Sequence, residues 1–176
     1  MKIIKEHINE KFTEDSDPIS DMGIGVNVKF KKYIKNELGV KNSNDIDIYK
    51  FGTSAAYGYD AILCKITCDN KSVELAEYVI LAKNANPACY NSLSLRWAAA
   101  RGNVEMIKLL IEHGANPNDS DSGSSVDCAV SYNQKEALKY LIKIGGRFDT
   151  TTPREVEFMF KNEPEYIKEL KKQNII

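Results

Sequence analysis

Two cysteines four residues apart are the first candidates for chemistry in this chain. Cys64 and Cys68 would share one face of a helix, a spacing at which two thiolates can bind one metal ion. A structural zinc site needs a further pair of ligands, and neither a second cysteine pair nor a histidine stands near these two in the sequence. We therefore interpret both as core thiols and expect no metal and no cofactor.

A complete catalytic set is also missing from the sequence. A nucleophilic cysteine such as Cys128 would require a histidine base, but His7 and His113 lie in different segments of the chain. Gly23-Ile24-Gly25 supplies two glycines of a dinucleotide-binding loop, whereas Val28 stands where the third is required. We expect a protein without catalytic activity.

Two kinds of charged cluster could bind a metal ion or nucleic acid, but neither has the full pattern that such a site requires. The aspartates of residues 15–21 and 119–121 lack the glycine and glutamate of a calcium loop, so we interpret them as solvated turns. Lysines alternate with Phe30 and Tyr33 between Lys29 and Lys35, a pattern that could contact nucleic-acid phosphates. A solvated helix face explains the same pattern, so nucleic-acid binding is kept only as an alternative.

Composition narrows the protein class. The 176 residues include 24 basic and 25 acidic side chains, with a net charge of −1, and 43% of the residues are hydrophobic. This is a globular composition without the positive charge that attracts nucleic acid or anionic membranes. The first residues lack the apolar run of a secretory signal, and no membrane-spanning run follows, so we expect a cytoplasmic protein without membrane contact.

The elements that would position these residues form a repeat of about 30 residues. Asn84-Ala85-Asn86-Pro87 recurs as Gly114-Ala115-Asn116-Pro117, and a third glycine turn begins at Gly145. Between the first two turns, apolar residues at helical spacing predict a short helix, a turn at Gly102, and a second helix. The next unit repeats this pattern, with Asn133 in place of Gly102.

This unit resembles the ankyrin repeat. Residues 102–116 are similar to the second half of the family consensus, in which a glycine, an apolar helix and a Gly-Ala-Asn turn follow one another. The first-helix signature is weaker, because residues 93–99 and 124–130 lack its Thr-Pro pair and its histidine. Residues 94–98 are also similar to ankyrin proteins of bacteriophages and large DNA viruses.

The resemblance implies an all-α fold, a short ankyrin-repeat solenoid of about four helix-turn-helix pairs. We assign the array to residues 53–176 and a small non-repeat N-terminal α/β cap or adaptor to residues 1–52. Within the cap we predict a helix over residues 2–12, an amphipathic helix over residues 28–38 and a short strand over residues 45–51. The terminal repeats match the consensus least, as expected where one face meets water.

For function, the resemblance implies binding of another protein through finger-like turns and first helices. On the family pattern, the predicted partner-binding residues are Tyr90, Ser92, Arg96, Arg101, Asp121, Asp127 and Tyr132. Aromatic and arginine side chains are typical of interface hot spots. Trp97 fits either the core or a partner contact.

Two other functional classes stay open at this point. Residues 1–50 could dock the protein into an assembly such as a virion, or the helix over residues 29–35 could associate with nucleic acid. If the chain is viral or from a phage, its partner would be a host or viral protein and its location the host cytoplasm.

Overall fold

The computed structural model describes residues 24–41, 43–47, 49–52, 56–120 and 123–176. The predicted helix over residues 2–12, His7, the aspartates of residues 15–21 and Asp121 lie outside the described residues.

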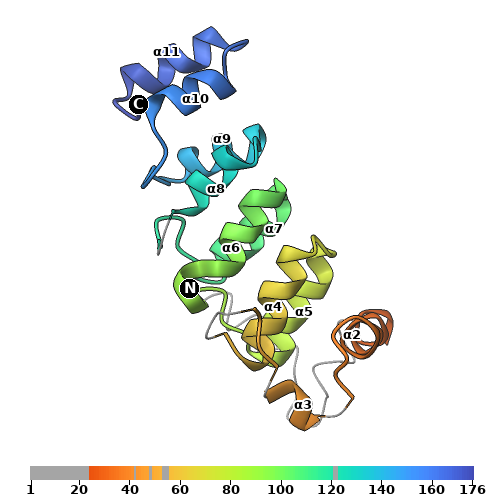
Figure 1. Ribbon diagram of the computed structural model, residues 1–176. Coiled ribbons are helices and arrows are strands. Elements are labelled where there is room, and N and C mark those ends of the chain that lie inside the picture. The colour runs from red at the N-terminus through yellow and green to blue at the C-terminus, as the bar shows by residue number, and fades with distance from the viewer. Residues whose placement is uncertain (1–23, 42, 48, 53–55, 121–122) are drawn as a thin grey trace, which may run out of the picture.

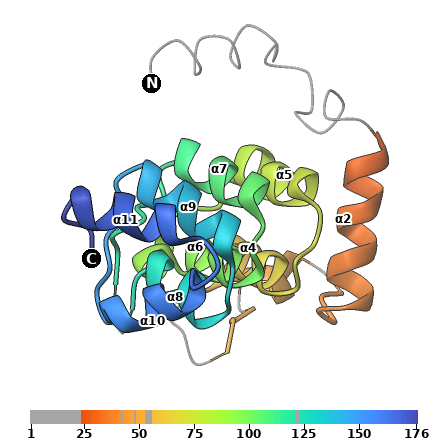
Figure 2. The same ribbon diagram turned by 90° about the horizontal axis from the view of Figure 1, so that it is seen from above.

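Four helix-turn-helix pairs stack along one axis, as predicted (Figure 1). The first helices of the pairs form an inner layer of α4 (Gly58–Cys68), α6 (Cys89–Arg101), α8 (Ser125–Ser131) and α10 (Pro153–Met159). The second helices form an outer layer of α5 (Val73–Lys83), α7 (Val104–Glu112), α9 (Lys135–Lys143) and α11 (Pro164–Lys172). Seen along the perpendicular direction, the two layers lie beside each other (Figure 2). No strand occurs in the described part of the chain.

The N-terminal segment differs from its predicted α/β form. It contains α2 (Ile24–Asn36) and α3 (Ser43–Asp47), and the predicted strand over residues 45–51 is wrong. Asp45 accepts a hydrogen bond from the Lys41 backbone amide at 2.9 Å, which favours a helical turn. Only one isolated bridge, between Lys50 and Tyr57, has strand-like pairing.

Helix α2 covers the first face of the array, beside α5 (Figure 2). Its buried aromatic side chains Phe30 and Tyr33 point inward, and the rings of Phe30 and Tyr78 have centroids 5.1 Å apart. The Tyr33 hydroxyl donates to Asp69 at 3.3 Å. The packing of α2 against α5 removes from water the apolar surface that a terminal repeat would otherwise expose.

Polar side chains cap the start of three helices of the array. The Asn103 side chain accepts the Met106 amide at the start of α7, and capping boxes begin α8 at Ser124 and α10 at Thr152. Such caps satisfy amides that have no partner within the helix, each worth about 1 kcal/mol. They fix where these three short helices start.

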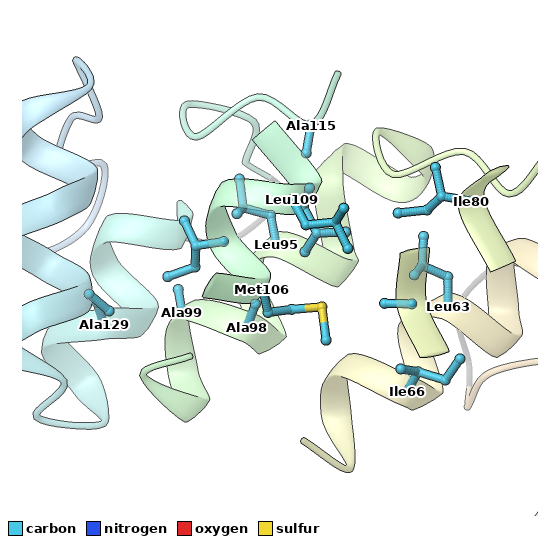
Figure 3. Packing of buried hydrophobic residues seen from close by; sticks show 14 of the residues in the cluster. Leu63, Ile66, Ile80, Leu95, Ala98, Ala99, Met106, Leu109, Ala115 and Ala129 are labelled. Carbon is cyan, nitrogen blue, oxygen red and sulfur yellow. The ribbon is translucent and has the colours of Figure 1, made fainter. Parts of the chain in front are cut away.

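Small side chains let neighbouring pairs approach closely. Ala98, Ala99 and Ala129 are buried where α6 and α8 meet (Figure 3). Larger side chains such as Leu95 and Met106 fill the space between the two layers. A larger residue at Ala98 or Ala99 would force the helices apart, because protein interiors have little free volume.

The residue before each outer helix bonds to the preceding pair. Asn103 Nδ2 donates to Asn70 Oδ1 at 2.9 Å, and Gln134 Nε2 donates to the Ala100 carbonyl at 3.2 Å. Glu163 holds the same position in the last pair, but its carboxylate accepts from Lys135 and Lys139, each at 2.8 Å. These bonds set the spacing of the turns along one edge of the array.

Truncation of Leu110 tests the stack. Leu110 is fully buried in α7, so Leu110→Ala should lower the free energy of unfolding by about 2–5 kcal/mol through lost burial and a new cavity. Glu112→Ala, an exposed change in the same helix, should stay within about 0.5 kcal/mol. Urea unfolding followed by circular dichroism measures both, and equal effects of the two variants would contradict the packing described.

Candidate functional site

A left-handed turn begins α6. Tyr90, Asn91 and Ser92 have φ values of 56°, 51° and 53°, so three successive non-glycine residues occupy the left-handed region. Each such residue costs about 1–2 kcal/mol, somewhat less for asparagine. Surrounding contacts must therefore hold the turn in place.

Side chains from two directions clamp this turn. Ser92 Oγ accepts the Asn116 amide at 2.9 Å and donates to Asp119 at 2.7 Å. A guanidinium nitrogen of Arg96 donates to the Tyr90 carbonyl at 3.3 Å. The Tyr90 side chain stays 39% exposed, so the turn presents an aromatic ring at the surface.

A pocket of about 150 Å³ lies between the inner helices α6 and α8. Its lining residues are Leu93, Arg96, Trp97, Ala100, Cys128 and Tyr132. Tyr132 is 56% exposed at its rim. The Trp97 ring meets Phe51 edge to face at 6.3 Å between centroids, so Trp97 is partly packed and also lines the pocket.

The structure brings three of the predicted residues together. Arg96 contacts Tyr90 through its hydrogen bond and shares the pocket with Tyr132. Arg101 is exposed at the opposite end of α6, where its Nε donates to the Cys68 carbonyl at 2.8 Å. Asp121 lies outside the described residues.

Two other predicted contacts, Ser92 and Asp127, are placed inside the protein. Their exposed fractions are 1% and 3%, so neither side chain is available to a partner in this structure. Asp127 accepts the backbone amides of Thr150 at 3.1 Å and Thr151 at 2.7 Å, and it closes the capping box with Ser124. Both residues instead hold the loop of the next repeat.

Hydrogen bonding controls the charge state of Asp127. Burial alone would raise the pKa of its carboxyl group, but hydrogen bonds from Thr151 and Ser124 outweigh burial and lower the pKa below the usual value. The carboxylate is therefore the form that the folded state prefers.

Two pocket residues, Leu93 and Cys128, were not among the predicted surface positions. A helical spacing of four residues relates Cys128 to Tyr132, and the same spacing relates Arg96 to Ala100. That periodicity was a signal for a shared face, but it does not distinguish a face in contact with a neighbouring helix from one that borders a pocket.

Comparison with known proteins gives the family. A family model described as ankyrin repeats, in three copies, matches residues 62–152, which is more than half of the chain. The chain belongs to the ankyrin-repeat family. No curated protein and no solved structure was found to match it.

The lysine-rich helix of this ankyrin protein is built as a packed cap. Phe30 and Tyr33 of α2 are buried, so they do not offer the exposed rings on which bases stack. Lys29 pairs with Glu74 at 3.5 Å, while Lys31 and Lys32 face solvent. The arrangement matches the solvated-face interpretation of this helix.

The structure also shows where the predicted core thiols lie and whether a described helix could cross a membrane. Cys64 is buried and its sulfur lies 3.3 Å from Ser94 Oγ, whereas Cys68 is partly exposed. Within the described residues there is no group of three or more acidic, histidine or cysteine side chains arranged for a metal ion. Among these residues, no helix has the length and hydrophobicity required to cross a bilayer.

Substitutions at Tyr90 test the left-handed turn. Tyr90→Gly should be more stable than Tyr90→Ala by about 1 kcal/mol, because glycine adopts a positive φ without the steric cost of a Cβ. At Lys108, in the right-handed helix α7, the order should reverse, with alanine more stable than glycine by about 1 kcal/mol. Thermal unfolding of the four variants provides the measurement. The same order at both sites would exclude the left-handed turn.

Acid titration tests Asp127. Because the pKa of this group is lowered by folding, its stabilising contribution should be complete above about pH 4 and fade as the pH falls through the folded-state pKa. Asp127→Asn should therefore lower the free energy of unfolding by about 1–3 kcal/mol at pH 7, and by less near pH 2. Glu112→Gln, at an exposed position, is the control. A loss at Asp127 that is independent of pH would contradict a role for its charge.

Proposed function

We propose that this protein binds another protein through the α6–α8 surface, defined here as Tyr90, Arg96, Trp97 and Tyr132. The pocket between α6 and α8 is the observation that carries the proposal. Ankyrin repeats serve as protein-interaction modules, and the family is typically non-enzymatic.

The composition of the α6–α8 surface supports this role. Tyrosine, tryptophan and arginine are the residue types that most often dominate interface energetics. Tyr90 and Tyr132 are among the few large hydrophobic side chains that stay exposed in the described chain. Arg96 lines the pocket with Trp97 and Tyr132 and holds the Tyr90 turn through its hydrogen bond to the Tyr90 carbonyl.

The left-handed turn supports the same conclusion. Strained backbone is retained where surrounding contacts enforce it, and it concentrates at functional sites. Here the turn fixes the backbone under Tyr90 before any partner arrives. A backbone that is already fixed loses little conformational entropy on binding, which favours affinity.

We further propose a division of the chain into a cap, residues 1–52, and an array, residues 53–176. The packing of α2 against α5 supports the capping role. We also propose a phage or viral source and a cytoplasmic location, with a host or viral protein as partner. The support for this source is the resemblance of residues 94–98 to ankyrin proteins of phages and large DNA viruses.

Affinity capture with matched variants tests the proposed surface. The triple variant Tyr90→Ala, Arg96→Ala and Tyr132→Ala should bind the partner with an affinity lower by roughly 30-fold or more. Each of the three residues is of a type that often dominates binding energy, and all three lie in one patch. A control triple variant changes exposed residues of the outer helices, Lys108→Ala, Glu112→Ala and Lys143→Ala, and should retain the partner.

Quantitative mass spectrometry of the captured proteins, with circular dichroism of each variant, completes the test. A folded triple variant that captures every wild-type partner at full strength would refute the α6–α8 surface. Residues 1–50, including the lysine face of α2, would then be the next region to vary.

A further inference from the structure

A second and larger hollow lies between the last two pairs. The C-terminal part of α8 and the turn after it form one wall, and α10 with the turn after it forms the other. Its volume of about 750 Å³ falls within the range of about 300–1,000 Å³ typical of ligand sites. We call it the α8–α10 groove, lined by Val130, Ser131, Asn133, Lys135, Arg154, Glu155, Phe158, Met159, Lys161 and Asn162.

The groove is open because the side chain that spans the preceding junction has a counterpart here that bonds elsewhere. Between the second and third pairs, Gln134 spans the junction and bonds to the Ala100 carbonyl. At the next junction Glu163 replaces it, and its carboxylate turns to Lys135 and Lys139 at the outer helix. The space beside Ser131 and Asn133 is left unfilled.

Positive charge dominates what the groove offers to a partner. Arg154 and Lys161 have no carboxylate within salt-bridge distance among the described residues. The one acidic lining residue, Glu155, accepts the amide and the hydroxyl of Thr152, both at 2.7 Å, so the described residues of the groove include two unpaired cations and one carboxylate. These bonds lower the pKa of Glu155 and keep it ionised as a helix cap.

An exposed aromatic ring lies beside one of these cations and lines the same groove. Phe158 is 74% exposed, the highest value among the large hydrophobic residues described, and Lys161 Nζ lies 5.1 Å from its ring centroid. Exposing a phenylalanine ring to water is unfavourable, so covering this ring with an apolar side chain of a partner would favour binding. Ring and cations together offer an apolar anchor flanked by positive charge.

We propose that the α8–α10 groove binds an acidic segment of a partner protein that carries an apolar side chain. The carboxylates of the segment would pair with Arg154 and Lys161, while its apolar side chain covers Phe158. Charge complementarity selects this occupant over a basic or neutral segment. The groove is separate from the α6–α8 surface, because Val130 and Ser131 line it, whereas Cys128 and Tyr132 line the pocket against α6.

A defined peptide probes the groove. A fluorescein-labelled peptide with glutamates around a central leucine pair is titrated with the full chain, and fluorescence anisotropy is followed. We expect saturable binding that weakens with added salt, because the contacting charges are at the surface. A peptide with lysines for the glutamates should not bind, and one with alanines for the leucines should bind more weakly.

Matched variants locate the site. Arg154→Glu with Lys161→Glu should weaken peptide binding by about tenfold or more, since two surface ion pairs are replaced by repulsion. Lys31→Glu with Lys32→Glu changes the net charge equally on α2, at the other end of the array, and should leave binding within about twofold. Phe158→Ala should weaken binding without lowering the melting temperature, because its ring is mostly exposed.

Three results would overturn the proposal. They are the absence of acidic-peptide binding, equal loss in both charge-reversed variants, and equal binding of the lysine peptide. Light scattering adds a fourth, because self-association abolished by the groove variants would make a second copy the occupant. The triple variant of the α6–α8 surface should bind the peptide normally, so failure there and failure of the groove are distinguishable.

Discussion

No helix pair in this molecule can cover its own apolar face, and the rest of the structure follows from that constraint. A pair has one face toward the preceding pair and another toward the next, so most of its stability comes from neighbours. The buried alanines of α6 and α8 permit the close approach that this requires. At the first end, Phe30 and Tyr33 of α2 take the place of a missing repeat.

Apolar contact alone would leave the long turns between pairs unanchored. Buried or half-buried acceptors near the start of the first three inner helices hold the following turn through its backbone amides. Asp60 accepts the Asn86 amide at 2.7 Å, Ser92 accepts that of Asn116, and Asp127 accepts those of residues 149–151. Unpaired backbone amides in these turns would be costly. The bond from the Asn116 amide to Ser92 joins two repeats and also helps to hold the strained turn at Tyr90.

The sequence predicted the features that depend on local pattern and missed those that depend on contact. Apolar spacing around Leu110 and the glycine turns identified the helix pairs, because each pair repeats one local pattern. The strand predicted over residues 45–51 was wrong because alternation over a few residues also fits a short helix whose first turn contains Asp45, the acceptor of the Lys41 amide. Asp127 was predicted to contact a partner but is buried by the next loop, which contains Thr151. The position of that loop is not encoded in the residues around Asp127.

One short helix separates the two candidate binding regions. Residues of α8 on one side border α6, and residues on the other side border α10, so a seven-residue helix faces both hollows. Its capping box and the bonds from Asp127 to the next loop fix its orientation relative to both neighbours. A single helix that is held in place therefore shapes one wall of each hollow.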